Sequence, residues 1–168
     1  MSFHCSVCGR LHEGRPAIGF LSPHYYHILS EEDKASLATL SEDFCIIEYG
    51  DQTDRFIRAV LNMPIKDSED TMDYGVWVSL SEKNFEYYMD HFKDDLEGET
   101  FFGYLCSSIP GYEDTLSLGT NVVCGPVGQR PRVYPHEGQS DNKFVKDCGE
   151  GISKEEADRR IHLVLNDD

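Results

Sequence analysis

Two cysteines near the amino terminus have the spacing of metal ligands. Cys5 and Cys8 are separated by two residues, and Gly9 follows them directly. Two intervening residues let both thiolates reach one ion, and glycine tolerates the tight turn that this requires. His12 can offer an imidazole to the same ion, because tetrahedral Zn²⁺ accepts mixed sulfur and nitrogen ligands. The spacing therefore predicts a Zn²⁺ site with Cys5, Cys8 and His12 among its ligands.

A fourth ligand must come from elsewhere, because no second C-x-x-C or C-x-x-H pair follows in the chain. Cys45 lies on a predicted strand that could present its thiol to the amino-terminal turn, so it is the preferred fourth ligand. His24 and His27, spaced H-x-x-H, are the alternatives. An ion with four protein ligands is structural and supplies folding energy to a polar segment. Structural Zn²⁺ is therefore the expected cofactor.

Other interpretations of the cysteine pair stay open. A metal with an open coordination position could activate water, but no H-E-x-x-H motif accompanies the pair. A redox pair of the thioredoxin type would follow a strand in a βαβ pattern, whereas this pair precedes the predicted strands. A reduced surface dithiol is the third possibility. Cys106 and Cys124 lie in apolar strand sequence and are predicted to be buried, unreactive thiols.

The elements that must position these ligands follow from the hydrophobic pattern. Ser30 precedes an acidic first turn and good helix formers, which predicts a helix start. Residues 43–49 and 55–65 are apolar runs separated by GDQTD, which predicts a β-hairpin closing at Pro64. Residues 74–80, with Val-Trp-Val at their centre, predict a strand near the middle of the sheet.

Two further helices are predicted downstream. The first runs from a cap at Ser81 to about Phe92, and its expected buried stripe consists of Phe85, Tyr88, Met89 and Phe92. The second begins at Ser153, where Glu156 is expected to complete a capping box. Its apolar face consists of Ala157, Ile161 and Val164.

The remaining strands complete the predicted architecture. Residues 101–106 form one strand, and residues 116–135 form two more that are broken by a Gly- and Pro-rich turn. Strands joined by short loops with few helices between them indicate an α+β fold, with a mostly antiparallel sheet and two or three helices. We expect a single domain over residues 1–168, with an N-terminal zinc-knuckle segment, residues 1–29, packed on it.

Charge restricts the classes of partner. The 168-residue chain has 31 acidic and 15 basic residues, a net charge of −16. Phosphate backbones and anionic membranes repel such a protein, so a basic protein is the expected partner rather than nucleic acid or membrane. The acidic excess lies between about residues 42 and 99, whereas residues 1–27 are nearly neutral. Arg130 and Arg132 form a local basic patch that could hold an anion or pair with the acidic surface, and pairing is the preferred prediction.

The lengths of the apolar runs in the sequence indicate the expected cellular compartment. The amino terminus lacks an apolar run of signal-peptide length, and no run is long enough for a membrane span. The sequence therefore predicts a cytoplasmic protein, in which the six cysteines stay reduced.

Several segments occur in an order typical of one protein family. They are C-x-x-C-G-x-x-H, DFCII, VWVSLSEKNFE, PGYEDTL, GQRPRV and a closing EGIS. In this order they resemble the uncharacterised bacterial DUF2199 proteins, and VWVSLSEKNFE with PGYEDTL is the most specific part. Relatives tend to carry Asp-His-Pro-Leu near the end, where this chain has Asp141-Asn142-Lys143-Phe144, so no role of that histidine carries over. The resemblance implies a small bacterial cytosolic protein with a zinc knuckle and no assigned reaction.

These features together predict a zinc-stabilised binding module without catalytic activity. Its acidic face would dock a basic protein, and an immunity-type role that neutralises a basic toxin is one concrete form. Acidity that serves only solubility is the competing explanation. The alternative function is a small metal-dependent hydrolase that uses the N-terminal metal site. In this case His24, His27 or nearby carboxylates would assist the reaction at the metal.

Overall fold

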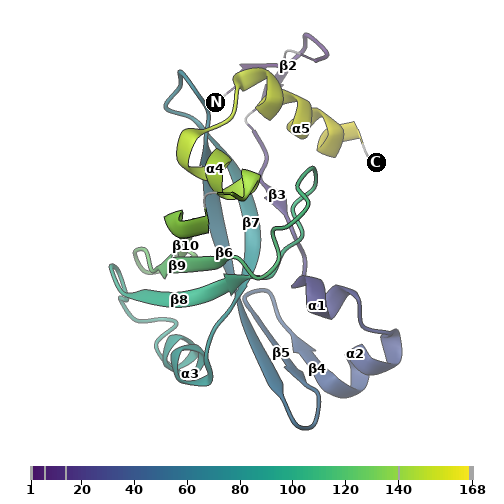
Figure 1. Ribbon diagram of the computed structural model, residues 1–168, viewed down its shortest axis with the longest axis vertical. Coiled ribbons are helices and arrows are strands. Elements are labelled where there is room, and N and C mark those ends of the chain that lie inside the picture. The colour runs from purple at the N-terminus through teal and green to yellow at the C-terminus, as the bar shows by residue number, and fades with distance from the viewer. Residues whose placement is uncertain (1, 6, 14, 140, 167–168) are drawn as a thin grey trace.

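The computed structural model describes residues 2–5, 7–13, 15–139 and 141–166 as a mixed α+β fold (Figure 1). β1 (Ser2–His4) and β2 (Leu11–Glu13) form a two-stranded sheet. The other strands form an eight-stranded sheet: β3 (Ile18–Gly19), β4 (Ala38–Leu40), β5 (Phe44–Glu48), β6 (Thr53–Pro64), β7 (Thr71–Ser79), β8 (Thr100–Leu105), β9 (Gly119–Val123) and β10 (Arg132–Pro135). Apart from β3–β7 and β10–β6, the named strand pairs in these ranges are antiparallel. The predicted α+β class is therefore confirmed.

The described residues contain five α-helices and one 3-10 turn. They are α1 (His24–His27), α2 (Glu31–Leu37), α3 (Glu82–Asp90), η1 (Glu137–Gln139), α4 (Lys143–Glu150) and α5 (Lys154–Asn166). This exceeds the predicted two or three helices, because α1 and α4 were not predicted. None of the helices in the described ranges combines the length and apolar character needed to cross a membrane.

Five strands close on themselves. The sheet order runs β3-β7-β8-β9-β10-β6-β5-β4, and β6 also pairs with β7. The ring β6-β7-β8-β9-β10 is thus continuous, closed by the parallel pair Arg132 and Val60. β7 pairs with β3, β6 and β8, which confirms its predicted central place. The long β6 and β7 extend beyond the closed part toward α4, α5 and β2 (Figure 1).

The two faces of β6 bury different cores, because successive strand residues point to opposite sides. Ile57, Ala59, Leu61 and Met63 face the larger core, which also contains side chains from α3, α4 and α5. Phe56 faces the other way, into a smaller core with Cys45, Ile47, Trp77 and Cys106. Side chains of α1 and α2 cover this smaller core, and the indole N–H of Trp77 donates to the carbonyl of Phe20 at 2.8 Å.

The predicted hairpin and helix caps are largely confirmed. β5 and β6 pair antiparallel, and β6 ends at Pro64 as expected. The hydroxyl oxygens of Ser30 and Ser81 accept hydrogen bonds from backbone amides three residues ahead, at 3.1 and 3.2 Å. α3 is shorter than predicted, however: it ends at Asp90, and Met89 and Phe92 are each 39% exposed. The predicted stripe is buried only where α3 faces the sheet, at Phe85 and Tyr88.

The chain between α4 and α5 makes a sharp turn against the end of β6. The carbonyl of Pro64 accepts a hydrogen bond from the amide of Ile152 at 2.9 Å. Gly151 has a φ of +88°, and a Cβ there would lie 2.9 Å from the Pro64 carbonyl oxygen, so only glycine fits. This turn directs α5 across the larger core, where Ala157 and Ile161 are buried.

Two details of the predicted tail helix need correction. Ser153 does cap α5 by accepting from the amide of Glu156 at 3.1 Å. The carboxylate of Glu156 instead accepts from Arg159 and Arg160, because these side chains share its face of the helix, so the predicted capping box is not completed. Val164 is 40% exposed, because the last turn of α5 extends past the core.

Candidate metal centre

Cys5 and Cys8 lie on one tight turn between β1 and β2. The amide of Cys5 donates to the carbonyl of Arg10 at 3.0 Å, and the amide of Gly9 donates to the carbonyl of Cys5 at 2.8 Å. Gly9 has a φ of +69°, the left-handed conformation that glycine adopts most readily, as the sequence predicted. The antiparallel pairing of β1 with β2 joins the two ends of the turn.

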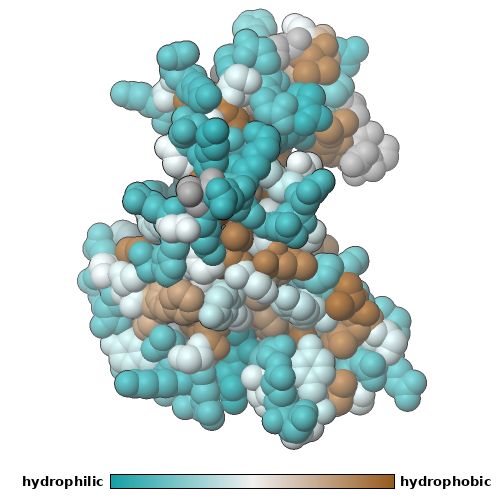
Figure 2. All heavy atoms as spheres, viewed as in Figure 1, coloured by the Kyte–Doolittle hydropathy of each residue, from teal (hydrophilic) through white to brown (hydrophobic). Residues whose placement is uncertain are grey.

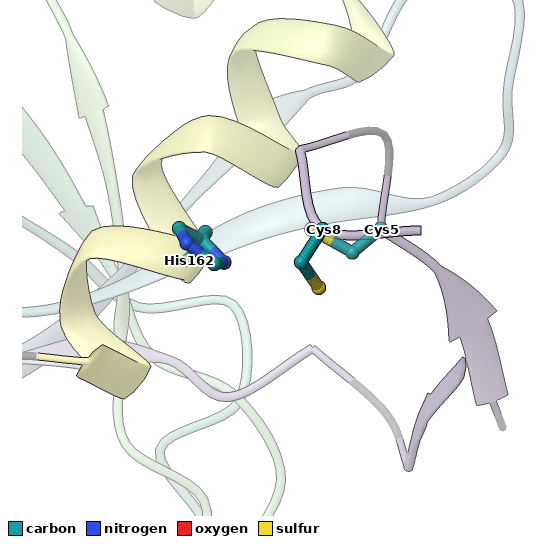
Figure 3. Close-up of side chains that lie close together, drawn as sticks. All are labelled: Cys5, Cys8 and His162. Atoms are coloured by element: carbon teal, nitrogen blue, oxygen red, sulfur yellow. The ribbon is translucent and has the colours of Figure 1, made fainter. Parts of the chain in front are cut away.

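His162 of α5 completes a group of three potential metal ligands. The ligand atoms of Cys5, Cys8 and His162 all lie within 4.8 Å of one another. Figure 3 shows His162 on the part of α5 that faces the turn. Ligands that share a tetrahedral ion at bond lengths of about 2.0–2.3 Å lie about 3.5–4 Å apart. Small side-chain movements would therefore let all three atoms bind one ion.

The turn itself favours the thiolate form of Cys5. The backbone amide of Cys8 is the largest influence on the pKa of Cys5 and lowers it, against the opposing effect of burial. The amide of Val7 acts in the same direction. Because the thiolate is the form that binds a metal, these amides prepare the turn for a cation.

A buried charge network fixes α5 beside the turn. Asp158 lies one helical turn before His162 and is fully buried. Its carboxylate contacts the ammonium of Lys154 at 2.9 Å and the guanidinium of Arg15 at 3.4 Å. Lys154 also donates to the carbonyl of His4 at 3.1 Å. The network therefore holds the amino-terminal segment against α5 on the same side of the helix as His162.

The structure does not bring Cys45 to this group. Cys45 is fully buried in the smaller core and pairs with Phe56, near the start of β6. The chain enters α5 beside Pro64, eight residues further along β6, or about 26 Å at the usual rise of a strand. Figure 1 accordingly shows β5 and α5 at opposite ends of the molecule.

The histidines that the sequence suggests as ligands lie on α1 and β2. His24 and His27 belong to α1, beside the smaller core, and are not members of the three-residue group. His12 lies in β2, and its side chain is outside the described part of the structure. Of the four predicted ligands, the described structure therefore joins Cys5 and Cys8 and adds His162.

Sequence reasoning missed His162 because it lies on the far end of the chain from the cysteine pair. A signal was present in the pattern of the tail helix. Lys154, Asp158 and His162 follow one another at four-residue intervals and form a polar stripe beside the apolar Ala157 and Ile161. A helix with both a buried apolar face and a histidine-bearing polar stripe was a reasonable source for the missing ligand.

The predicted burial of two other cysteines is confirmed. Cys106 is 3% exposed and Cys124 is 5% exposed. Burial raises the pKa of Cys106 to about 12 and that of Cys124 to about 11. Both thiols therefore stay protonated at neutral pH, as expected of structural cysteines.

Comparison with known proteins supports a family assignment. A family profile described as "Uncharacterized protein conserved in bacteria (DUF2199)" matches residues 4–152. The match includes Cys5 and Cys8 and ends before His162. No curated protein and no solved structure matches the chain. Since the profile covers most of its length, the chain belongs to the DUF2199 family of uncharacterised bacterial proteins.

Proposed function

We propose that the protein is a non-catalytic binding module stabilised by Zn²⁺, which is held by Cys5, Cys8 and His162, with His12 as the fourth ligand that the sequence suggests. The observation that carries this proposal is the convergence of three ligand atoms within 4.8 Å from opposite ends of the chain. Two thiolates and an imidazole form a soft donor set that suits Zn²⁺ better than Mg²⁺ or Ca²⁺. The ion would be partly buried, because one of the three ligand residues is buried and the other two are half-buried.

A structural role of the ion fits the low intrinsic stability of the β1–β2 hairpin. β1 and β2 pair through only three residues each, and an isolated hairpin of this size is marginally stable in water. An ion bound by the Cys5–Cys8 turn and by α5 would join this hairpin to the larger core. Metal binding would then contribute directly to the free energy of folding.

The acidic surface supplies the proposed binding face. Glu82, Glu86 and Asp90 follow one another at four-residue intervals on α3, and Glu99 lies across a shallow groove from them. All four side chains are exposed, and we call this set the acidic strip. The face of the molecule in Figure 2 is mostly hydrophilic, with smaller hydrophobic patches. A basic protein, such as a toxin that the module neutralises, is the partner whose charge fits the strip.

Metal analysis of matched variants tests the proposal. We expect about one equivalent of zinc in the purified protein, and strongly reduced zinc in Cys8→Ala and His162→Ala, because each loses a ligand. The controls are Cys148→Ala and His27→Ala, which remove a thiol and an imidazole outside the group and should keep their zinc. Elemental analysis measures the content, and thermal unfolding with and without chelator measures the effect on stability.

The outcomes separate the possible roles of the ion. Loss of zinc with a lower unfolding temperature supports a structural site. Full zinc occupancy in both ligand variants contradicts the ligand assignment. An apo protein that is as stable as the zinc-bound form contradicts the structural role and favours a hydrolytic metal site instead.

A further inference from the structure

An open cavity of about 670 Å³ lies far from the metal centre, between the end of α3, the strands β6 and β7 and the segment 124–131. Its volume is in the range of small-molecule binding sites. The apolar side chains of Val60, Tyr88, Phe92 and Leu96 form part of its lining. Figure 1 shows α3 at the end of the molecule opposite α5, so this cavity is independent of the proposed metal site.

One side of the cavity offers an oriented carboxylate. Asp73 of β7 is half-buried, and its Oδ1 atom accepts hydrogen bonds from Asn62 Nδ2 at 2.6 Å and Thr71 Oγ1 at 2.7 Å. Both donors are neutral, and Asp73 has no ion pair within the described ranges. Asp73 is therefore held in place while its negative charge stays uncompensated.

The other side of the cavity offers a guanidinium. Arg130 is paired as the sequence predicted, with Asp43 at 2.8 Å and Glu42 at 3.4 Å. Arg132 is exposed, and its side chain has no hydrogen bond or ion pair within the described part of the chain, contrary to the prediction. The guanidinium of Arg132 therefore leaves a positive charge at the edge of the cavity.

Strand register places the two charges on one face of the sheet. Asp73 is opposite Asn62 on β6, and Arg132 is opposite Val60 on the same strand. Val60 and Asn62 are two residues apart, so they point to the same side. Asp73 and Arg132 therefore flank β6 on the cavity side, yet they do not form a salt bridge with each other. A ligand with two opposite charges could span them.

We infer that this cavity binds a zwitterionic small molecule, an α-amino acid with a large apolar side chain. The ammonium group donates to Asp73, and the carboxylate accepts from the guanidinium of Arg132. The apolar side chain of the ligand lies against Tyr88, Phe92 and Leu96. Each charge of the ligand thus meets a group that the protein leaves without a partner of opposite charge.

A set of three related probes tests the inference. L-Phenylalanine carries both charges, phenethylamine only the ammonium, and 3-phenylpropionate only the carboxylate. We expect L-phenylalanine to bind most tightly in NMR titrations of the full-length protein, with shifts confined to the cavity residues. Arg132→Gln and Asp73→Asn should each weaken binding about tenfold, because each removes one charge-assisted hydrogen bond. Lys66→Gln and Glu150→Gln remove one charge of each sign outside the cavity and are the controls.

Each possible result supports or overturns the inference. If 3-phenylpropionate binds as tightly as L-phenylalanine and Asp73→Asn has no effect, the site takes simple anions and the zwitterion assignment is wrong. If none of L-phenylalanine, L-leucine and L-methionine causes shifts at millimolar concentrations, the cavity is not an amino-acid site. Zinc content should be unchanged in all four variants, so this test is separate from that of the metal centre.

Discussion

The cysteines of this protein differ in acidity because their surroundings differ. Burial raises the pKa of Cys45, Cys106 and Cys148 to about 12, and the guanidinium of Arg160 opposes this effect only in part at Cys148. The backbone amides of the amino-terminal turn lower the pKa of Cys5. Local geometry therefore separates Cys5, whose thiolate form is favoured, from the core cysteines, whose thiols stay protonated at neutral pH.

Alkylation of the native protein should distinguish the turn from the core cysteines. With the metal removed by a chelator, we expect the half-buried Cys8 to react with iodoacetamide much faster than the buried Cys45 and Cys106 at about pH 8. At that pH only about one in ten thousand thiols with a pKa of about 12 is ionised. Peptide mass spectrometry measures each rate. Rapid native-state labelling of Cys45 or Cys106 would contradict the prediction, and labelling in denaturant provides the reference for all six thiols.

At the scale of elements, a second polar network joins α4 and α5 to the sheet. Tyr112 donates to the carboxylate of Asp147 on α4 at 2.6 Å. Arg160 of α5 donates to the hydroxyl of Tyr112 and to that of Tyr74 on β7, each at 2.9 Å. Its guanidinium also lies 5.0 Å from the ring centre of Tyr112. Tyr112 thus connects both C-terminal helices, and with them His162, to the core of the fold.

Removing one hydroxyl should weaken this connection. We expect Tyr112→Phe to lower the free energy of unfolding by about 1–3 kcal/mol, because Asp147 and Arg160 each lose a partly buried hydrogen-bond partner. Tyr104→Phe is the control, since its exposed hydroxyl has no hydrogen bond within the described ranges, and we expect a change below about 0.5 kcal/mol. Urea denaturation measures both. Equal effects of the two substitutions would argue against the network.

At the scale of the whole molecule, the positions of the acidic residues, and not only the net charge of −16, decide where a basic partner would bind. The candidate metal centre and the acidic strip lie at opposite ends of the structure, on α5 and α3 (Figure 1). A protein partner on the strip would therefore leave the ion and its ligands uncovered. This arrangement suits an ion that stabilises the fold rather than one that contacts the partner.

Binding of a basic polymer should depend on the strip more than on net charge. We expect the double variant E86Q/D90N to weaken binding of poly-L-lysine several-fold more than E31Q/E32Q, which removes the same number of exposed charges from α2. Affinities at low and high salt measure the electrostatic part. Equal weakening by both double variants would show that only net charge matters, and affinity that is unaffected by salt would contradict the proposed binding mode.

Much of the fold followed from local patterns. The Ser30 and Ser81 caps and the β5–β6 hairpin involve residues close in the chain, so composition and spacing were sufficient to predict them. α4 was not predicted, because its identifying features are an Asn142 cap and two buried residues, Phe144 and Val145, within a largely polar segment. Such a short helix depends on the core that it covers.

The sequence by itself determined the chemistry of the Cys5–Cys8 turn, the charge balance and the α+β class, because each depends on neighbouring residues or on composition. Only the tertiary structure decided that His162, rather than Cys45, lies beside the turn. Cys8 and His162 are 154 positions apart, and their approach depends on the turn at Gly151 and on the packing of α5. Contacts over such separations are set by the whole core, which no local pattern of residues encodes.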